Sequence, residues 1–352
     1  MRLVKIRHAL PVLLVLAAAC ASKPAPAPAP AAPAVPPAAE LAKSGIDVAL
    51  TADVVLKDSS RDREIPLRVT YPEGVRPFPV IVFAPGAGAT ARTYDPLARF
   101  WATRGFAVVV LAQADAAGAK DAAADAAHET AADVSPDPKT WETSVRDVEF
   151  VAAATGAIEA RVNGLKLDDA RIGIGGQSFG AFAAMLLAGA TVDVSRKEKA
   201  KSFANPLPKA FLLLSPPGKG QQGLTEKSWS AVDRPLMVVT GTKDPGAKNQ
   251  DASWRLDAYQ LSPPGNKFAV FIEGASHLSV TGLAAESGAA STKAAGKKSS
   301  APEDEVAIFL DVKAATLAFW EAYLKGDASA RAFLAGDGLA KESDNRAQLL
   351  RR

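Results

Sequence analysis

Short apolar runs alternate with amphipathic stretches along most of the chain. Each run holds a block of consecutive apolar residues, and the runs span residues 78–85, 106–113, 170–176, 209–217, 234–242 and 267–274. The stretches with apolar residues at three- and four-residue intervals span residues 93–105, 140–155, 252–261 and 305–326. Strands that are apolar on both faces and alternate with helices are typical of a mostly parallel sheet covered on both sides. We therefore expect an α/β fold.

Two segments that precede these runs follow a different pattern. Residues 48–58 and 63–72, the second with alternating apolar positions, predict a pair of antiparallel strands at the N-terminal edge of the sheet. Residues 114–139 are rich in Ala and Asp, and residues 281–302 are of low complexity. Both are long for connections in a compact domain, so each is either a functional surface, such as a lid, or disordered.

The first forty residues do not follow a globular pattern. Residues 1–19 carry three basic residues, then an apolar stretch and three alanines, and Cys20 follows. This order is that of an export signal, and it resembles a bacterial lipoprotein signal in which Cys20 is lipidated, although Ala17 stands where Leu is usual. The Ala/Pro-rich residues 20–40 predict an extended tether. We expect a folded domain over residues 41–335 and a charged tail over 336–352.

The anchor determines where we expect the protein to be. A lipidated Cys20 places it in the cell envelope, and Ala21 after the cysteine resembles outer-membrane sorting in Gram-negative bacteria. An ordinary secretory signal would instead give a secreted or periplasmic protein, and an uncleaved anchor is the third alternative. Cys20 is the single cysteine of the chain and has no intramolecular disulfide partner. This favours the lipoprotein.

Charge argues against nucleic acid as a partner. The chain has 41 Lys and Arg against 38 Asp and Glu, and three of the basic residues lie in the signal, which leaves 38 of each sign. A protein that binds nucleic acid is expected to carry an excess of basic residues gathered on one face. We therefore expect no nucleic-acid partner.

A glycine-rich loop after the run at 78–85 allows a nucleotide-binding interpretation. Gly86, Gly88 and Ala91 have the G-x-G-x-x-G/A spacing of dinucleotide-binding loops. Pro85 opens the loop, however, and two strands already precede it. The first acid after the next strand is Asp115, later than the usual ribose partner. The loop alone is a weak signal for a dinucleotide.

A second glycine motif is more specific. Gly176-Gln177-Ser178-Phe179-Gly180 matches G-x-S-x-G between a predicted strand and a predicted helix. In such an elbow the serine adopts an unfavourable backbone conformation, and the residues two before and two after must be small. Gly176 and Gly180 meet that requirement. A glycine-rich turn without chemistry is the alternative, and the motif by itself does not decide between them.

A serine nucleophile requires a base, and the chain offers few histidines. His8 lies in the predicted signal and His128 in the Ala/Asp-rich loop, whereas His277 lies in the loop just past the predicted strand at 267–274. Ligands of open α/β folds bind at the carboxyl ends of the strands, where His277 is expected. We therefore expect His277 to be the base.

The carboxylate that orients the base is expected at another strand end. Asp244 follows the run at 234–242, although its Asp-Pro-Gly sequence is also typical of a simple turn. Asp251 and Asp257 lie in a stretch that resembles a solvent-facing helix, and Glu273 ends the same strand as His277. Asp244 is the favoured residue.

Ser178, Asp244 and His277 stand in the order nucleophile, acid and base of α/β-hydrolases. Residues 46–335 resemble that fold, and in particular the subgroup of dienelactone hydrolases, platelet-activating-factor acetylhydrolases and chlorophyllase-like enzymes. The segments that carry the resemblance are PFPVIVFAPGAG, LARFWATRGFAVVV, RIGIGGQSFGAFAA, LLLSPPG, VVTGTKD and EGASH. Pro85 stands where this subgroup commonly has histidine.

The resemblance implies a function. It predicts an exported serine esterase for small or lipid-like esters, without cofactor or metal, in which the amides of Ala87 and Phe179 form the oxyanion hole. A catalytically silent envelope lipoprotein that binds a ligand is the alternative. Trp101, Trp141, Trp229 and Trp254 are candidates to line a pocket, but the helical positions of Trp101 and Trp141 are typical of core residues.

Overall fold

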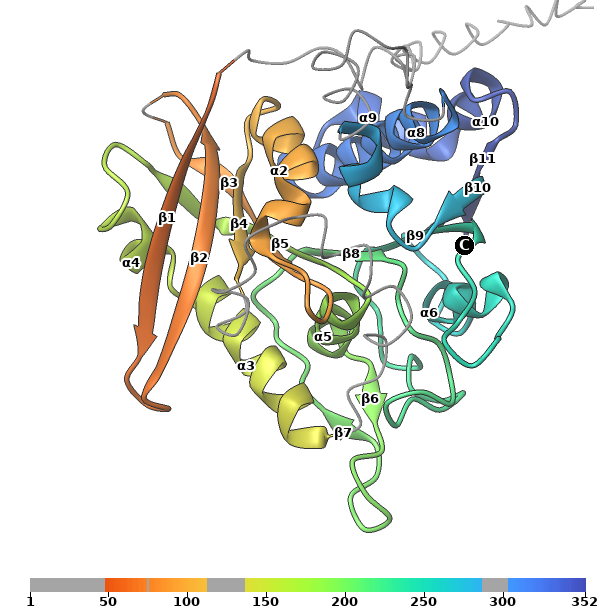
Figure 1. The fold of residues 1–352 in the computed structure, drawn as a ribbon, viewed down its shortest axis with the longest axis horizontal. Helices are drawn as coiled ribbons and strands as arrows, with labels where there is room; N and C mark the ends of the chain where they lie inside the picture. The colour runs from red at the N-terminus through yellow and green to blue at the C-terminus, as the bar shows by residue number, and fades with distance from the viewer. Residues whose placement is uncertain (1–47, 75, 113–136, 287–302) are drawn as a thin grey trace, which may run out of the picture. The chain divides into compact units, whose positions relative to one another are not determined.

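The computed structural model describes residues 48–74, 76–112, 137–286 and 303–352, and Figure 1 shows their arrangement. Cys20, the predicted signal and tether, His128 and most of the two irregular segments lie outside these ranges. Nine strands form one mixed sheet in the order β1-β2-β4-β3-β5-β8-β9-β10-β11. They are β1 (Ala49–Asp58), β2 (Arg63–Pro72), β3 (Phe78–Ala84), β4 (Ala107–Leu111), β5 (Leu167–Gln177), β8 (Ala210–Leu214), β9 (Leu236–Lys243), β10 (Lys267–Ser276) and β11 (Ala347–Arg351).

The sheet is parallel from β4 to β10 and antiparallel at both edges. β1 pairs with β2, and β2 with β4, in antiparallel register. The neighbours β4–β3, β3–β5, β5–β8, β8–β9 and β9–β10 are all parallel. The expected α/β fold, with a mostly parallel sheet and an antiparallel N-terminal edge, is therefore confirmed. The carboxyl ends of the parallel strands meet at one edge, because parallel strands end on the same side.

Helices cover both faces of the sheet, as Figure 1 shows. They are α2 (Asp95–Ala102), α3 (Pro138–Ala153), α4 (Thr155–Glu159), α5 (Phe179–Ala188), α6 (Asp257–Gln260), α8 (Glu303–Trp320), α9 (Ala328–Ala335) and α10 (Gly338–Glu342). Successive residues of β3 enter opposite layers: Val80 and Val82 pack with α3 and α5, and Ile81 and Phe83 with α2 and α8. Because both faces are covered, the central strands β3, β4 and β8 are apolar and buried along their whole length.

Local sequence determines where the helices near the carboxyl edge begin and end. The Asp137 side chain accepts a hydrogen bond from the Lys139 amide, and Pro138 occupies the first turn of α3. All ten residues of α5 are buried, so this helix is apolar on every side. It ends at Gly189, whose φ of 116° is accessible mainly to glycine. Trp101 and Trp141 are buried in the core, as their helical positions predicted.

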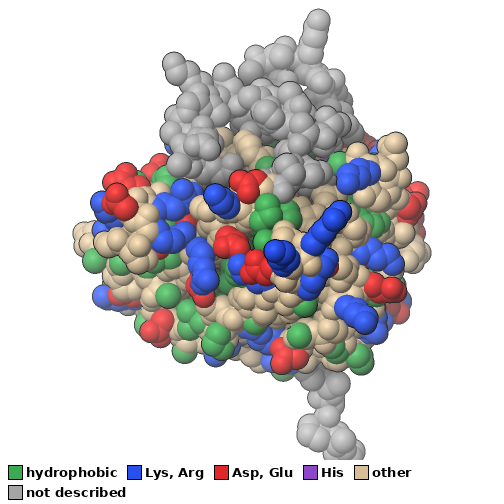
Figure 2. Space-filling view, turned by 90° about the horizontal axis from the view of Figure 1, so that it is seen from below, with side chains coloured by type: hydrophobic (Ala, Val, Ile, Leu, Met, Phe, Trp, Pro, Cys, Tyr) green, Lys and Arg blue, Asp and Glu red, His purple; other side chains and the backbone are tan. Residues whose placement is uncertain are grey.

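The C-terminal residues differ from the expected tail. Residues 338–342 form α10, and residues 347–351 form β11, which pairs with β10 as the last strand of the sheet. An edge strand needs to bury only one face. The sequence of β11 accordingly lacks the continuous apolar run that marks the central strands, so the sequence pattern did not predict this strand. Figure 2 shows acidic and basic side chains interspersed over one face of the protein. No helix within the described ranges is both long and apolar enough to cross a bilayer.

Candidate functional site

Ser178 lies at the sharp turn between β5 and α5. β5 ends at Gln177, α5 begins at Phe179, and Ser178 has φ 52° and ψ −113°. Non-glycine residues rarely adopt this conformation. The Ser178 amide donates to the carbonyl of Leu214, at the end of the neighbouring strand β8, over 2.9 Å. The turn is thereby attached to the carboxyl edge of the sheet.

The two glycines that flank Ser178 have no room for a side chain. A Cβ atom on Gly176 would lie 2.3 Å from the carbonyl carbon of Gly180, and one on Gly180 would lie 2.0 Å from the carbonyl oxygen of Ala84. Both contacts are with backbone, which cannot move aside as the end of a side chain can. The tight turn therefore depends on glycine at both positions.

Asp244 and His277 lie side by side at the same edge. Asp244 follows β9 directly and His277 follows β10, and Oδ1 of Asp244 is 2.8 Å from Nδ1 of His277. The Asp244 side chain is fully buried, whereas that of His277 is 12 % exposed. A carboxylate only accepts hydrogen bonds, so this contact assigns a proton to Nδ1 and leaves Nε2 as the basic nitrogen of a neutral imidazole.

The buried carboxylate of Asp244 has further partners. Its Oδ2 accepts a hydrogen bond from Oγ1 of Thr240 over 2.7 Å, and its Oδ1 lies 2.6 Å from Nε of Arg255. Burial favours the neutral form of Asp244, yet its pKa lies below the ordinary value because His277 and Arg255 together stabilise the carboxylate. Asp244 is therefore ionised at neutral pH.

A buried chain of hydrogen bonds joins the turn at Ser178 to the loops on either side. The Gly86 amide donates to the hydroxyl of Tyr94 over 2.8 Å, and this hydroxyl donates to Oε1 of Gln177 over 3.0 Å. Nε2 of Gln177 in turn donates to the carbonyl of His277 over 3.3 Å. The side chains of Tyr94 and Gln177 thus connect the end of β5 with the loops that follow β3 and β10.

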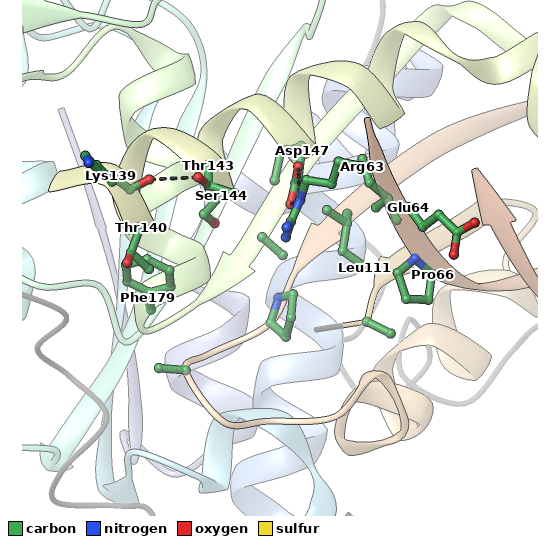
Figure 3. Close-up of a pocket in the computed structure, with 16 residues that line it drawn as sticks. Arg63, Glu64, Pro66, Leu111, Lys139, Thr140, Thr143, Ser144, Asp147 and Phe179 are labelled. Atoms are coloured by element: carbon green, nitrogen blue, oxygen red, sulfur yellow. Dashed lines mark hydrogen bonds and ion pairs between the residues drawn. The ribbon is translucent and has the colours of Figure 1, made fainter. Parts of the chain in front are cut away.

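A cavity of about 390 Å³ opens beside this edge. Ala87 and Phe179, the residues predicted to supply oxyanion amides, both line it. In Figure 3 side chains of α3 lie along one wall, with Phe179 near one end and residues of β2 toward the other. The polar lining residues are Arg63, Glu64, Lys139, Thr140, Thr143, Ser144 and Asp147. The volume suits a small organic ligand.

The remaining sequence candidates lie elsewhere or serve other purposes. Asp251 accepts a hydrogen bond from the Ser253 amide, Asp257 accepts one from the Lys219 amide, and Glu273 is exposed. The loop of Gly86 and Gly88 leads into a turn of four residues, η1 (Ala91–Tyr94), which continues directly into α2. The Gly86 amide donates to the hydroxyl of Tyr94 within the protein, whereas a dinucleotide site directs such amides at the phosphates.

Three residues of this region were missed by the sequence analysis. Tyr94 and Arg255 lie in stretches that resemble ordinary amphipathic helices, and Gln177 occupies the variable position of the serine motif. A polar residue at an expected core position is the only local signal that was available for them.

Comparisons with known proteins do not assign the chain to a family. No protein-family model matches it, and no curated protein matches its sequence. Within the described residues there is no group of three or more His, Cys, Asp and Glu side chains that could hold a metal ion. The site is therefore interpreted from its own geometry.

Proposed function

We propose that the protein is a serine hydrolase of the α/β-hydrolase fold that cleaves carboxylic esters. The observation that carries the proposal is the arrangement at the carboxyl edge of the sheet. There a serine with positive φ, between two obligatory glycines, shares the edge with a buried Asp244–His277 pair. A strained serine at a strand-to-helix turn, combined with an oriented imidazole, is the pattern of an activated nucleophile.

The reaction would proceed through an acyl-enzyme. Nε2 of His277 takes the proton from Oγ of Ser178 as the oxygen attacks the ester carbonyl, while ionised Asp244 stabilises the imidazolium. The same proton passes to the departing alcohol, and a water molecule activated by His277 then releases the acid and restores the serine. The amides of Ala87 and Phe179 would hold the tetrahedral oxyanion, and the loss of one such donor costs about 3 kcal/mol.

The cavity beside Ala87 and Phe179 supports small or medium-sized esters as substrates. Its volume is about 390 Å³, and its walls combine apolar side chains with hydroxyl groups and charged side chains. We further propose that Cys20 carries a lipid anchor and that the Ala/Pro-rich residues act as a tether, which would place the domain in the cell envelope.

The replacement Ser178→Ala tests the proposal. It should lower kcat for p-nitrophenyl ester hydrolysis by about 10⁶-fold, as in other triads, and abolish labelling by a fluorophosphonate probe. Ser144→Ala, which removes another serine hydroxyl from the cavity lining, is the matched control and should still be labelled. A wild-type protein that neither reacts with the probe nor hydrolyses esters would instead indicate a binding protein.

A further inference from the structure

Arg255 is a buried arginine directly behind the Asp244–His277 pair. It belongs to the short helical turn η4 (Ala252–Leu256), and its side chain is 1 % exposed. Its Nε lies 2.6 Å from Oδ1 of Asp244 and donates to the main-chain oxygen of the same residue over 2.9 Å. Buried guanidinium groups are rare because they lose their hydration, so the partners of this one indicate its role.

The other nitrogens of Arg255 bond to strand-end loops. Nη1 donates to the carbonyl of Ser215, after β8, over 3.0 Å, and Nη2 donates to the carbonyl of Pro245, after β9, over 3.0 Å. One rigid guanidinium therefore holds two loops of the carboxyl edge together. Because Asp244 lies within one of these loops, Arg255 also determines the direction of its carboxylate.

The charge of Arg255 acts on the same oxygen that His277 contacts. Oδ1 of Asp244 lies 2.6 Å from the guanidinium and 2.8 Å from Nδ1 of His277. A carboxylate that already balances one positive charge favours a second one less strongly than an unpaired carboxylate does. The fixed positive charge therefore opposes protonation of the imidazole, which must be neutral to act as a base.

We infer that Arg255 is a positioning residue that directs the carboxylate of Asp244 toward His277. Its charge also keeps the His277 imidazole neutral, and so able to act as a base, at lower pH than an isolated Asp–His pair would. This inference rests on the proposed hydrolase function, in which His277 is the base.

Other charged groups near His277 do not replace this effect. Glu305 of α8 accepts a hydrogen bond from Oγ of Ser279, in the turn that follows His277. Lys243, at the end of β9, lies opposite Ser276 of β10 in the sheet. These two charges are of opposite sign. Asp257, beyond Arg255, accepts a hydrogen bond from the amide of Lys219. Apart from His277 itself, Arg255 is the ionisable side chain of the described residues that contacts the Asp244 carboxylate directly.

The test compares the pH dependence of Arg255 variants in the full-length protein. For Arg255→Met, the acid limb of kcat/KM for a p-nitrophenyl ester should move to higher pH by about one unit, the effect expected from removing a charge a few ångströms away. Arg255→Lys keeps the charge without the planar fork, so the limb should move by less than half as much while kcat falls. If Arg255→Met does not fold, the pH dependence of kcat/KM is measured for Arg255→Gln instead.

Arg234→Met is the matched control. Arg234 also binds main-chain carbonyls, among them those of Leu187 and Pro208, but has no contact with Asp244. Its replacement should reduce stability and leave the pH limb unchanged. The inference would be overturned if a folded variant with an uncharged side chain at position 255 kept the acid limb of kcat/KM at the wild-type pH. It would also be overturned if Arg234→Met moved this limb by the same amount.

A second readout separates this inference from the proposed function. In the Ser178→Ala background, the ring signals of His277 are followed by NMR against pH and assigned with His277→Gln. The titration midpoint should rise by about one unit when Arg255 is also replaced by Met. This measurement requires no ester hydrolysis, so an inactive wild-type protein would contradict the proposed function while the midpoints still decide the role of Arg255.

Discussion

At the scale of single residues, Ser178 is held in a conformation that it would not adopt alone. Its φ of 52° with ψ of −113° is favourable only for glycine. The Ser178 amide is bonded to Leu214, and the Ser178 carbonyl accepts from the Phe182 amide in the first turn of α5. The bonds on both sides maintain the strain, so the position of the hydroxyl is obtained at the expense of stability.

This strain predicts an unusual order of stabilities. Ser178→Gly should be more stable than Ser178→Ala by about 1 kcal/mol, because glycine adopts the native φ without a penalty. The free energies of unfolding in urea provide the measurement. At Ser144, within helix α3, the order should be reversed, since glycine in a helix interior is less stable than alanine by about 1 kcal/mol. The same order at both positions would contradict the strain.

The positions of some residues at this edge follow from the sequence more readily than the positions of others. Ser178, Asp244 and His277 each follow a recognisable strand run, so the sheet topology brings their loops to one edge. Gln177, Tyr94 and Arg255 depend on contacts between distant segments: Tyr94 and Gln177 are 83 residues apart. Local pattern does not show which polar side chains of a helical stretch turn inward, and for this reason Arg255 was missed.

At the scale of elements, an ion-pair cluster joins the β1–β2 hairpin to α3. Asp147 of α3 is mostly buried and contacts Nη1 of Arg61 and Nε of Arg63, each over 2.8 Å. Arg63 and Asp147 both line the cavity beside Phe179. One carboxylate therefore fixes the distance between two walls of the proposed substrate site.

Replacing Asp147 should affect both stability and substrate binding. Asp147→Asn leaves two arginines without their shared partner and should lower the free energy of unfolding by about 2 kcal/mol, allowing for the partial exposure of both guanidinium groups. It should also raise KM more than it lowers kcat, because the cavity wall moves while the Asp244–His277 pair does not. Urea unfolding and ester kinetics provide the measurements.

Asp62→Asn on the same hairpin is the control for this prediction. Asp62 pairs with Lys57, and the two side chains are 88 % and 55 % exposed. Its replacement should change stability by less than about 0.5 kcal/mol and leave KM unaltered. Equal effects at the two positions would show that the cluster around Asp147 does not support the cavity.

At the scale of the whole domain, β11 forms one edge of the sheet. β11 pairs with β10, and Ala347 is fully buried against the C-terminal helices. Just before β11, Arg346 is paired with the buried Asp311 of α8 over 2.9 Å. Burial raises the pKa of Asp311, although Arg346 opposes this effect. The C-terminal segment therefore supports β10, the strand that carries His277 at its end.

A truncation after Glu342 tests whether this segment belongs to the cooperative unit. It removes β11, exposes the hydrogen-bonding edge of β10 and leaves Asp311 without Arg346. We expect Tm to fall by about 5 °C or more, with aggregation through the open edge, and calorimetry with size-exclusion chromatography to detect both. The double replacement of Gln348 and Leu350, whose side chains are exposed, by Lys keeps the strand and should leave Tm nearly unchanged. If the truncated protein retained both its Tm and its elution volume, β11 would contribute little to the domain, and the support of His277 would have to come from β9 and α8 alone.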